Sequence, residues 1–162
     1  MRFAGRAEVE RRRQKLQATF VMVNQQDLSS ELLAHYARYL CVLVSGFAEQ
    51  SVKELASHYC KRRASDPVHR YVRGQLSLLR NIDLEKLRKL IQAFSPEWWQ
   101  QIETDLGDEL QAFVSVASTR NNVSHGGDSG ITISVVGQYF EQVSRVLSRL
   151  SELFDPDERD GQ

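Results

Sequence analysis

One polar stretch of the sequence combines residue types that enzymes use for chemistry. Residues 118–130 have the sequence STRNNVSHGGDSG, in which an arginine, two amides, a hydroxyl and a histidine precede two glycines. A helix that only packs needs apolar residues here, and a loop needs no arginine and histidine at fixed spacing. The stretch therefore indicates a functional cluster around Arg120, Asn121, Ser124 and His125. The alternative is structural, with Arg120 paired to a carboxylate, His125 capping carbonyls and the amides ending a helix.

Helical geometry limits what one copy of this cluster can do. Residues four apart share a face of a helix, so Arg120 lies over Ser124 and Asn121 lies over His125. Arg120 and His125 are five apart and point about 140° away from each other around the axis. One helix thus supplies a polar patch. Two copies about a two-fold axis would place two arginines and two histidines around one cleft.

Length and composition are those of an ordinary soluble domain. The 162 residues fit a single domain that can bury a core without cross-links. Three prolines and nine glycines are too few for an all-β sandwich or barrel. The two cysteines lack metal-binding spacing, so we expect free thiols and no metal site. The N-terminal segment lacks the apolar core of a signal peptide, and no apolar run approaches the roughly 20 residues of a membrane span. We expect a cytoplasmic protein without membrane contact.

The two halves of the chain carry opposite charge although the whole is neutral. Residues 1–81 hold 14 Lys and Arg against 7 Asp and Glu, and residues 82–162 hold the reverse. The first half can therefore present a basic face to a polyanion. Equally, basic and acidic helices can pair with each other in the fold. Both interpretations remain open from the sequence.

Apolar residues at every third or fourth position predict an all-α protein, an up-and-down helical bundle with short additional helices. The long second helix is capped by Asp27, Ser29 or Ser30, and Asp66-Pro67 is expected to cap and open the third. Gly126 and Gly127 stop the helix that carries the cluster. The expected helices span residues 6–25, 28–63, 66–79, 83–94, 95–106, 108–125 and 132–154. We expect one domain over 1–162, with its core at about 28–154 and a frayed acidic tail at 155–162.

The residues RNNVSHG, at positions 120–126, resemble the R-x4–6-H motif of HEPN domains. The surrounding order is also similar, because a long second helix carries FAEQSVKEL and a final amphipathic helix follows ASTRNNVSHGG. The sequence is most similar to HEPN proteins of the RiboL-PSP kind, which occur among bacterial toxins and defence systems. The likeness extends from about Leu28 to Phe154.

The resemblance implies metal-independent cleavage of RNA, with no cofactor. The family's arginine, polar residue and histidine correspond to Arg120, Asn121 and His125. The ribose 2′-OH attacks the adjacent phosphorus, and His125 removes that proton or protonates the leaving oxygen. The planar, permanently charged guanidinium of Arg120 suits the negative charge that develops on phosphorus. Asn121 orients either the histidine or the phosphate. Glu49, on the long helix, is a candidate partner of Arg120, with a solvated glutamate as the alternative.

The resemblance and the motif geometry together suggest partners for the chain. We expect a homodimer in which the Arg120 and His125 side chains face each other across the axis, with RNA as substrate and an antitoxin or defence-system protein as partner. The cations Lys61, Arg62 and Arg63 would extend the RNA groove if they lie on the same face. HEPN toxins of the HepT type carry a tyrosine two residues after the histidine, where their antitoxin modifies them. Gly127 stands there instead, so we do not expect that silencing. The alternative function is a non-catalytic HEPN module for dimerisation or partner docking.

Overall fold

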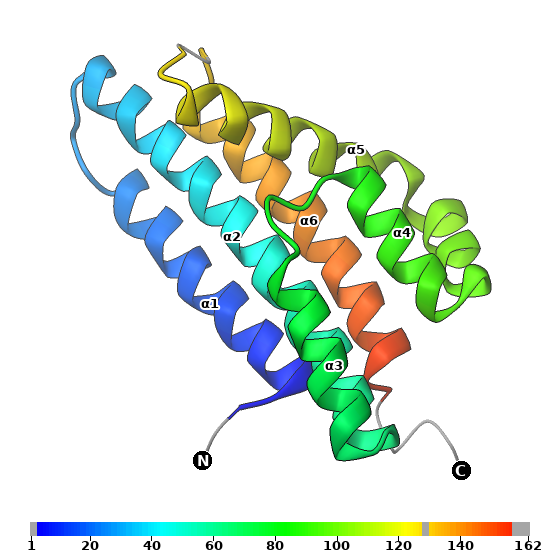
Figure 1. Cartoon of the computed structure of the whole chain (residues 1–162). Coiled ribbons are helices and arrows are strands. Elements are labelled where there is room, and N and C mark those ends of the chain that lie inside the picture. The colour runs from blue at the N-terminus through cyan, green and yellow to red at the C-terminus, as the bar shows by residue number, and fades with distance from the viewer. Residues whose placement is uncertain (1–2, 128–129, 157–162) are drawn as a thin grey trace.

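Six α-helices and no strand make up residues 3–127 and 130–156, which are the residues that the computed structural model describes. The helices are α1 Gly5–Asn24, α2 Ser30–Arg63, α3 Asp66–Ser77, α4 Leu84–Phe94, α5 Pro96–Ser124 and α6 Ile133–Phe154. Figure 1 shows α1, α2 and α6 running side by side, with α3 across the end of α2 and α4 beside α5. The expected all-α bundle, in which the two long helices pack with the motif helix, is confirmed.

Local side-chain caps set most helix starts where the sequence predicts them. Each capping oxygen accepts the backbone N–H of the residue three positions later, which satisfies one donor left free by the first turn. The pairs are Ser29 with Leu32, Asp83 with Lys86, Ser95 with Trp98 and Thr132 with Val135. Short-range hydrogen bonding thus fixes the starts of α2, α4, α5 and α6.

One expected boundary differs from the structure and another is confirmed. Asp66 does not cap α3: it is the first helical residue, and Ser65 precedes it in an extended conformation without a side-chain cap. The expected helices 95–106 and 108–125 are the two parts of α5, which meet at a kink where Leu106 has a φ of −136° and a ψ of 31°. A non-helical residue at the predicted break, beside Gly107, bends the axis between the two parts.

The core lies where α2, α5 and α6 meet. Leu40, Val44 and Leu55 of α2 are fully buried there, as are Val143 and Leu150 of α6. Aromatic rings close the core toward the end of α6, where Phe94, Tyr59 and Trp98 surround Phe154 with ring centroids 5.0–5.7 Å apart. None of the described helices has the length and apolar character needed to cross a membrane. The buried apolar contacts hold α5 rigidly against α2, and this fixes the position of the motif.

Asp155 ties together three helices at the end of the bundle where α1 begins and α6 ends (Figure 1). Its carboxylate accepts the backbone N–H of Arg6 at 2.9 Å and an N–H of Arg62 at 3.3 Å. Gly5 has a φ of 55°, and a Cβ at this position would collide with Asp155 and His58. Asp155, the first residue of the expected frayed tail, is held in the fold by these contacts. Residues 157–162 of that tail lie outside the described part.

Candidate active site

The motif lies in the last turn of α5, which ends in the glycine stop that the sequence predicts. Gly126 has a φ of 76°, and its N–H donates to the carbonyl of Val123 at 3.1 Å. The N–H of Gly127 donates to the carbonyl of Asn122 at 2.9 Å. These two bonds form a Schellman motif, which needs a left-handed residue such as glycine. A Cβ at Gly127 would collide with the Asn122 side chain, whose exposed amide would have to move to admit it.

Arg120 is partly buried and keeps its guanidinium available. It makes no hydrogen bond, and no ion pair within 4.0 Å, with the described residues. The positive charge of Arg120 contributes to lowering the pKa of Glu49 on α2. The pairing of Arg120 with Glu49 therefore remains a prediction that this electrostatic influence supports. The N–H groups of the guanidinium are left for another acceptor.

Glu49 is a half-buried carboxylate whose two oxygens are both occupied. Oε1 accepts from Lys53 Nζ at 2.9 Å, and Oε2 accepts from the backbone N–H of Asn81 at 2.7 Å. Burial is the largest influence on the Glu49 pKa and raises it. The bonds from Lys53 and Asn81, with the charges of Lys53 and Arg120, outweigh burial and bring the pKa below its ordinary value. Glu49 is therefore ionised at neutral pH and acts as a fixed negative charge.

Asn81, in the connection between α3 and α4, links Glu49 to the motif and was missed by the sequence analysis. Its side-chain Nδ2 donates to Asn121 Oδ1 at 2.6 Å. Its φ of 48° is the one positive value among the described non-glycine residues. Asparagine tolerates this left-handed conformation better than most residues. An asparagine just before the helix cap Asp83 was the available signal, because such positions favour turns with positive φ.

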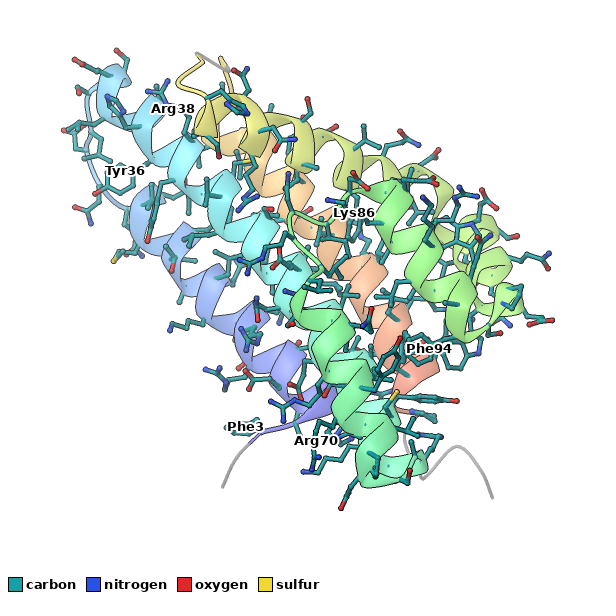
Figure 2. All side chains as sticks on the ribbon, in the orientation of Figure 1. Phe3, Tyr36, Arg38, Arg70, Lys86 and Phe94 are labelled. Carbon is teal, nitrogen blue, oxygen red and sulfur yellow. The ribbon has the colours of Figure 1, made fainter. Side chains whose placement is uncertain are left out.

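Lysines surround this cluster and make it cationic. Lys86, at the start of α4, reaches back over the α3–α4 connection, where Nζ donates to the carbonyls of Arg80 at 2.7 Å and Asn81 at 3.4 Å (Figure 2). Lys53 occupies the other side of Glu49. Together with Arg120, these cations outnumber the two carboxylates of Glu49 and Asp83, the latter of which caps α4 on the backbone N–H of Lys86. The local charge therefore favours an anion, even though the whole chain is neutral.

The remaining motif side chains face solvent. His125 is the C-cap of α5, and its backbone N–H donates to the carbonyls of Asn121 and Asn122. The side chains of Ser124 and His125 are exposed and make no hydrogen bond with the described residues. Since α5 is helical through Ser124, Arg120 and His125 keep the divergent directions expected of residues five apart. Within one chain the structure joins Arg120, Asn121 and Glu49, and leaves His125 at the edge of this group.

Comparison with known proteins identifies the family of the chain. The family model for RiboL-PSP-HEPN matches residues 7–155. The chain belongs to the RiboL-PSP-HEPN family. The match includes α1. The resemblance noted from the sequence begins near Leu28 and so leaves α1 out. HEPN domains are typically ribonucleases, and the family therefore implies RNA as the substrate. No curated protein and no solved structure matches the chain.

In this HEPN domain the cations Lys61, Arg62 and Arg63 lie far from the motif. They end α2, 12 or more residues beyond Glu49, which corresponds to about 18 Å along the helix. Arg62 bonds to Asp155, and the Arg63 guanidinium carbon lies 4.1 Å from the centroid of the Tyr59 ring. Within one chain, Lys61, Arg62 and Arg63 therefore do not lie close to Arg120. Their contact with RNA remains a prediction.

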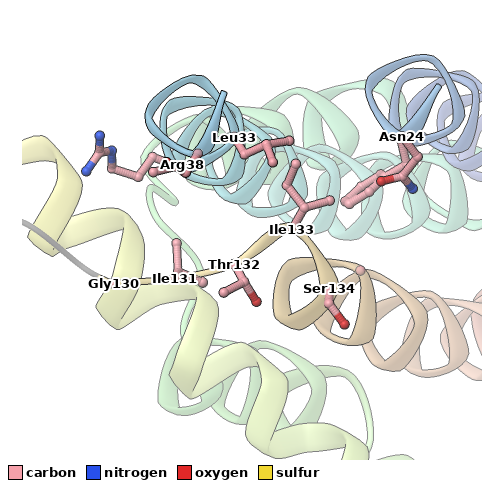
Figure 3. A pocket seen from close by; sticks show the side chains of 12 residues that line it. Asn24, Leu33, Arg38, Gly130, Ile131, Thr132, Ile133 and Ser134 are labelled. Atoms are coloured by element: carbon pink, nitrogen blue, oxygen red, sulfur yellow. The ribbon is translucent and has the colours of Figure 1, made fainter. Parts of the chain in front are cut away.

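A groove of about 800 Å³ opens near the motif but contains none of its side chains. The start of α2, the end of α1 and the segment that enters α6 form its walls (Figure 3). Figure 3 shows Leu33 and Arg38 on one side and Ile131 and Ile133 on the other. Its lining includes no proton-transfer group, and we assign it no role in the reaction. Among the described residues no group of three or more His, Cys, Asp and Glu could hold a metal ion.

Proposed function

We propose that this HEPN domain is an endoribonuclease that uses Arg120, Asn121 and His125 and works as a homodimer. The observation that supports this most is the Arg120 guanidinium, whose charge lowers the pKa of Glu49 yet which has no hydrogen-bond acceptor among the described residues. A cation with its N–H groups available is suited to a phosphate. The exposed His125, five residues further on, provides a group for proton transfer.

The reaction follows from the chemistry of RNA and needs no external nucleophile. The ribose 2′-oxygen forms a bond to the adjacent phosphorus as the bond from phosphorus to the 5′-oxygen breaks. The products are a 2′,3′-cyclic phosphate and a free 5′-hydroxyl. His125 takes the 2′-OH proton or supplies a proton to the 5′-oxygen, and Arg120 stabilises the charge on the phosphorus oxygens.

The C-terminal end of a helix is an unfavourable place for a phosphate, because its free carbonyls carry negative charge. Here the carbonyls of Asn121, Asn122 and Val123 all accept N–H groups from the glycine stop and its cap. These bonds reduce the exposed negative charge. The cations around Glu49 attract the phosphate and overcome the remaining repulsion from the helix carbonyls.

Dimerisation supplies the part of the site that one chain lacks. Arg120 and His125 diverge on one helix, so a proton donor and a proton acceptor cannot both flank one phosphate from a single chain. A two-fold pairing of the α5 ends would place two of each side chain at one groove, and such dimers are the commonest oligomers. One histidine would then serve as base and the other as acid.

The first test is cleavage of cellular RNA in EDTA by the wild-type chain and by His125→Ala. We expect cleavage by the wild type, with loss of about 10²- to 10⁴-fold in the variant, the range typical of a general acid or base. Asn122→Ala is the matched control, since Asn122 is an exposed neighbour on the same helix. Intact RNA with folded, dimeric wild type would reject the enzyme and favour the docking module.

A mixed dimer tests whether the site is shared. One chain carries His125→Ala and the other is wild type, and each has a different affinity tag so that the mixed species can be purified. A shared site with one acid and one base predicts that the mixed dimer loses most of its activity. Retention of full activity would show that each chain carries a complete site. Sedimentation that shows a monomer at micromolar concentration would also contradict the proposal.

We also propose that the enzyme acts as a toxin or defence effector with a neutralising partner protein. The family resemblance to toxins and defence systems supports this role. Expression should arrest growth, and Arg120→Ala should relieve the arrest at equal protein level. Because Gly127 stands where HepT-type toxins carry the modified tyrosine, neutralisation is expected to act by another route than modification at this position.

A further inference from the structure

We propose that Asn81 is a positioning residue that turns the Asn121 amide so that its NH2 group donates to the RNA phosphate. The proposal rests on the proposed function, and it chooses between the two roles that the motif leaves open for Asn121. In one role the Asn121 oxygen accepts a hydrogen bond from an N–H of the His125 ring and so orients it. In the other its NH2 group binds the phosphate.

The hydrogen bond between the two asparagines decides the orientation. Asn81 Nδ2 donates to Asn121 Oδ1 at 2.6 Å, so the Asn121 oxygen faces the α3–α4 connection. Asn121 is nevertheless exposed, and its NH2 group makes no hydrogen bond with the described residues. An amide has its donors and its acceptor on opposite sides. With the oxygen engaged inward, the group that Asn121 presents to a substrate is the NH2.

Asn81 is itself fixed by several independent contacts. Its backbone N–H donates to Glu49 Oε2 at 2.7 Å, and its carbonyl accepts from Lys86 Nζ at 3.4 Å. The buried Oδ1 atom of Asn81 has no partner among the described residues, so the side chain is held through its NH2 group alone. The positive φ at this position holds the residue in the conformation that makes these bonds together. A left-handed residue with such contacts is a reasonable sign of a functional constraint.

The outcome is a phosphate site with two kinds of donor side by side. The Arg120 guanidinium and the Asn121 NH2 group come from adjacent residues, and both are connected to the same Glu49–Asn81 support. Donors held in place before the reaction stabilise developing negative charge without reorganisation. An accepting oxygen at residue 121 would instead repel the phosphate.

Asn121→Asp separates the two roles, because the substitution is nearly isosteric. The carboxylate still accepts from Asn81 Nδ2, but it presents an oxygen where the wild type presents NH2. We expect kcat to fall at least as far as in Asn121→Ala, by about 10- to 100-fold, the range for one hydrogen bond to a charged group. If Asn121→Asp keeps more activity than Asn121→Ala, the residue works as an acceptor and the proposal is wrong.

Asn81→Gly tests the positioning role without disturbing the backbone. Glycine adopts the positive φ and keeps the N–H that bonds to Glu49, so only the bond to Asn121 is lost. We expect kcat to fall by roughly 3- to 10-fold with little change in KM, since ordering of the amide matters most in the transition state. In the Asn121→Ala background the same change should have no further effect. Additive losses would show that Asn81 acts on stability or by another route.

A measurement on RNA binding keeps this proposal separate from the proposed function. The probe is a 2′-O-methyl RNA oligonucleotide, which cannot be cleaved, and the readout is the NMR signals of the asparagine side-chain amides. In the free protein we expect slow exchange for the Asn81 NH2 and fast exchange for that of Asn121. On binding, the Asn121 NH2 should shift more than that of Asn122. This result would stand even if wild type cleaves no RNA. Slow exchange at Asn121 instead, or an unmoved Asn121 NH2 in the bound state, would overturn the proposal.

Discussion

Arg120 of α5 and the two arginines at the end of α2 differ in how their charges are compensated. Arg62 bonds to Asp155 at 3.3 Å, and Arg63 stacks over the Tyr59 ring. Arg120 has no contact of either kind with the described residues. Its neighbour Glu49 is a carboxylate, but Lys53 and Asn81 already occupy both of its oxygens. The same residue type is thus used for the fold at one end of the bundle and left available near the other.

The difference shows how a fold keeps a cation ready for a ligand. A carboxylate in direct contact with an arginine neutralises the guanidinium charge and accepts hydrogen bonds from its N–H groups. Such a pair stabilises the fold. A carboxylate whose oxygens are engaged elsewhere still orients the guanidinium through its charge, while the N–H groups remain free. Glu49 has the second function for Arg120. Whether the N–H groups of an arginine are paired or available therefore depends on what else the neighbouring carboxylate binds.

The largest expected contrast comes from one conservative change made in both groups. Arg120→Lys keeps the charge but loses the planar set of donors, and we expect kcat/KM to fall by about 10²-fold, as for loss of a transition-state donor. Arg62→Lys should leave kcat/KM within about threefold, because its N–H groups serve the fold. Both variants are assayed with the same RNA. Equal losses would remove the distinction between the two groups.

Changes at the α2 end should lower the stability of the fold and leave cleavage unchanged. Asp155→Ala removes the acceptor for the Arg6 N–H and the partner of Arg62, and we expect the free energy of unfolding to fall by about 1–3 kcal/mol. Cleavage per folded molecule should not change, because Asp155 lies at the other end of the bundle. Chemical denaturation measures the first effect. The control is Glu141→Ala, an exposed carboxylate on α6, which should change stability by less than about 0.5 kcal/mol.

The charge of Glu49 should appear as a pH dependence of stability. Its pKa in the folded chain is lower than the ordinary value of 4.5, so ionisation favours the folded state. This contribution is complete well above pH 4.5 and is lost as the pH falls through the folded pKa. Wild type should therefore exceed Glu49→Gln in unfolding free energy by about 1 kcal/mol at pH 7. The gap should narrow below pH 4.5 in denaturation series, and a constant gap would contradict the assignment.

The smallest effect is expected at Lys61, the exposed cation of the α2 end. If this end contacts RNA, Lys61→Gln should reduce the slope of log K against log salt by about 0.7, the value for one phosphate contact on a single strand. The cleavage step should be unaffected. Lys89→Gln, on the exposed face of α4, serves as the comparison. An unchanged slope would show that the cations ending α2 do not touch RNA.

The sequence alone determined the helices and the place of the motif. Apolar spacing and the capping residues Ser29, Asp83, Ser95 and Thr132 act within a few residues, so their effects follow from local chemistry. The same holds for the glycine stop after His125, whose bonds all lie within one turn. The spacing of Arg120 and His125, together with the glycine stop and the order of the surrounding helices, suggested the family, which the match over residues 7–155 then established.

Only the tertiary structure decided which side chains support the motif. Asn81 contacts Glu49 and Asn121, which are 32 and 40 residues away in the chain. Such contacts leave no periodic signal, because they depend on how the α3–α4 connection folds against α2 and α5. The retention of Asp155 in the fold was hidden for the same reason. Local hydrogen bonds fix where a helix begins and ends, whereas the partners of an exposed polar residue depend on packing between distant segments.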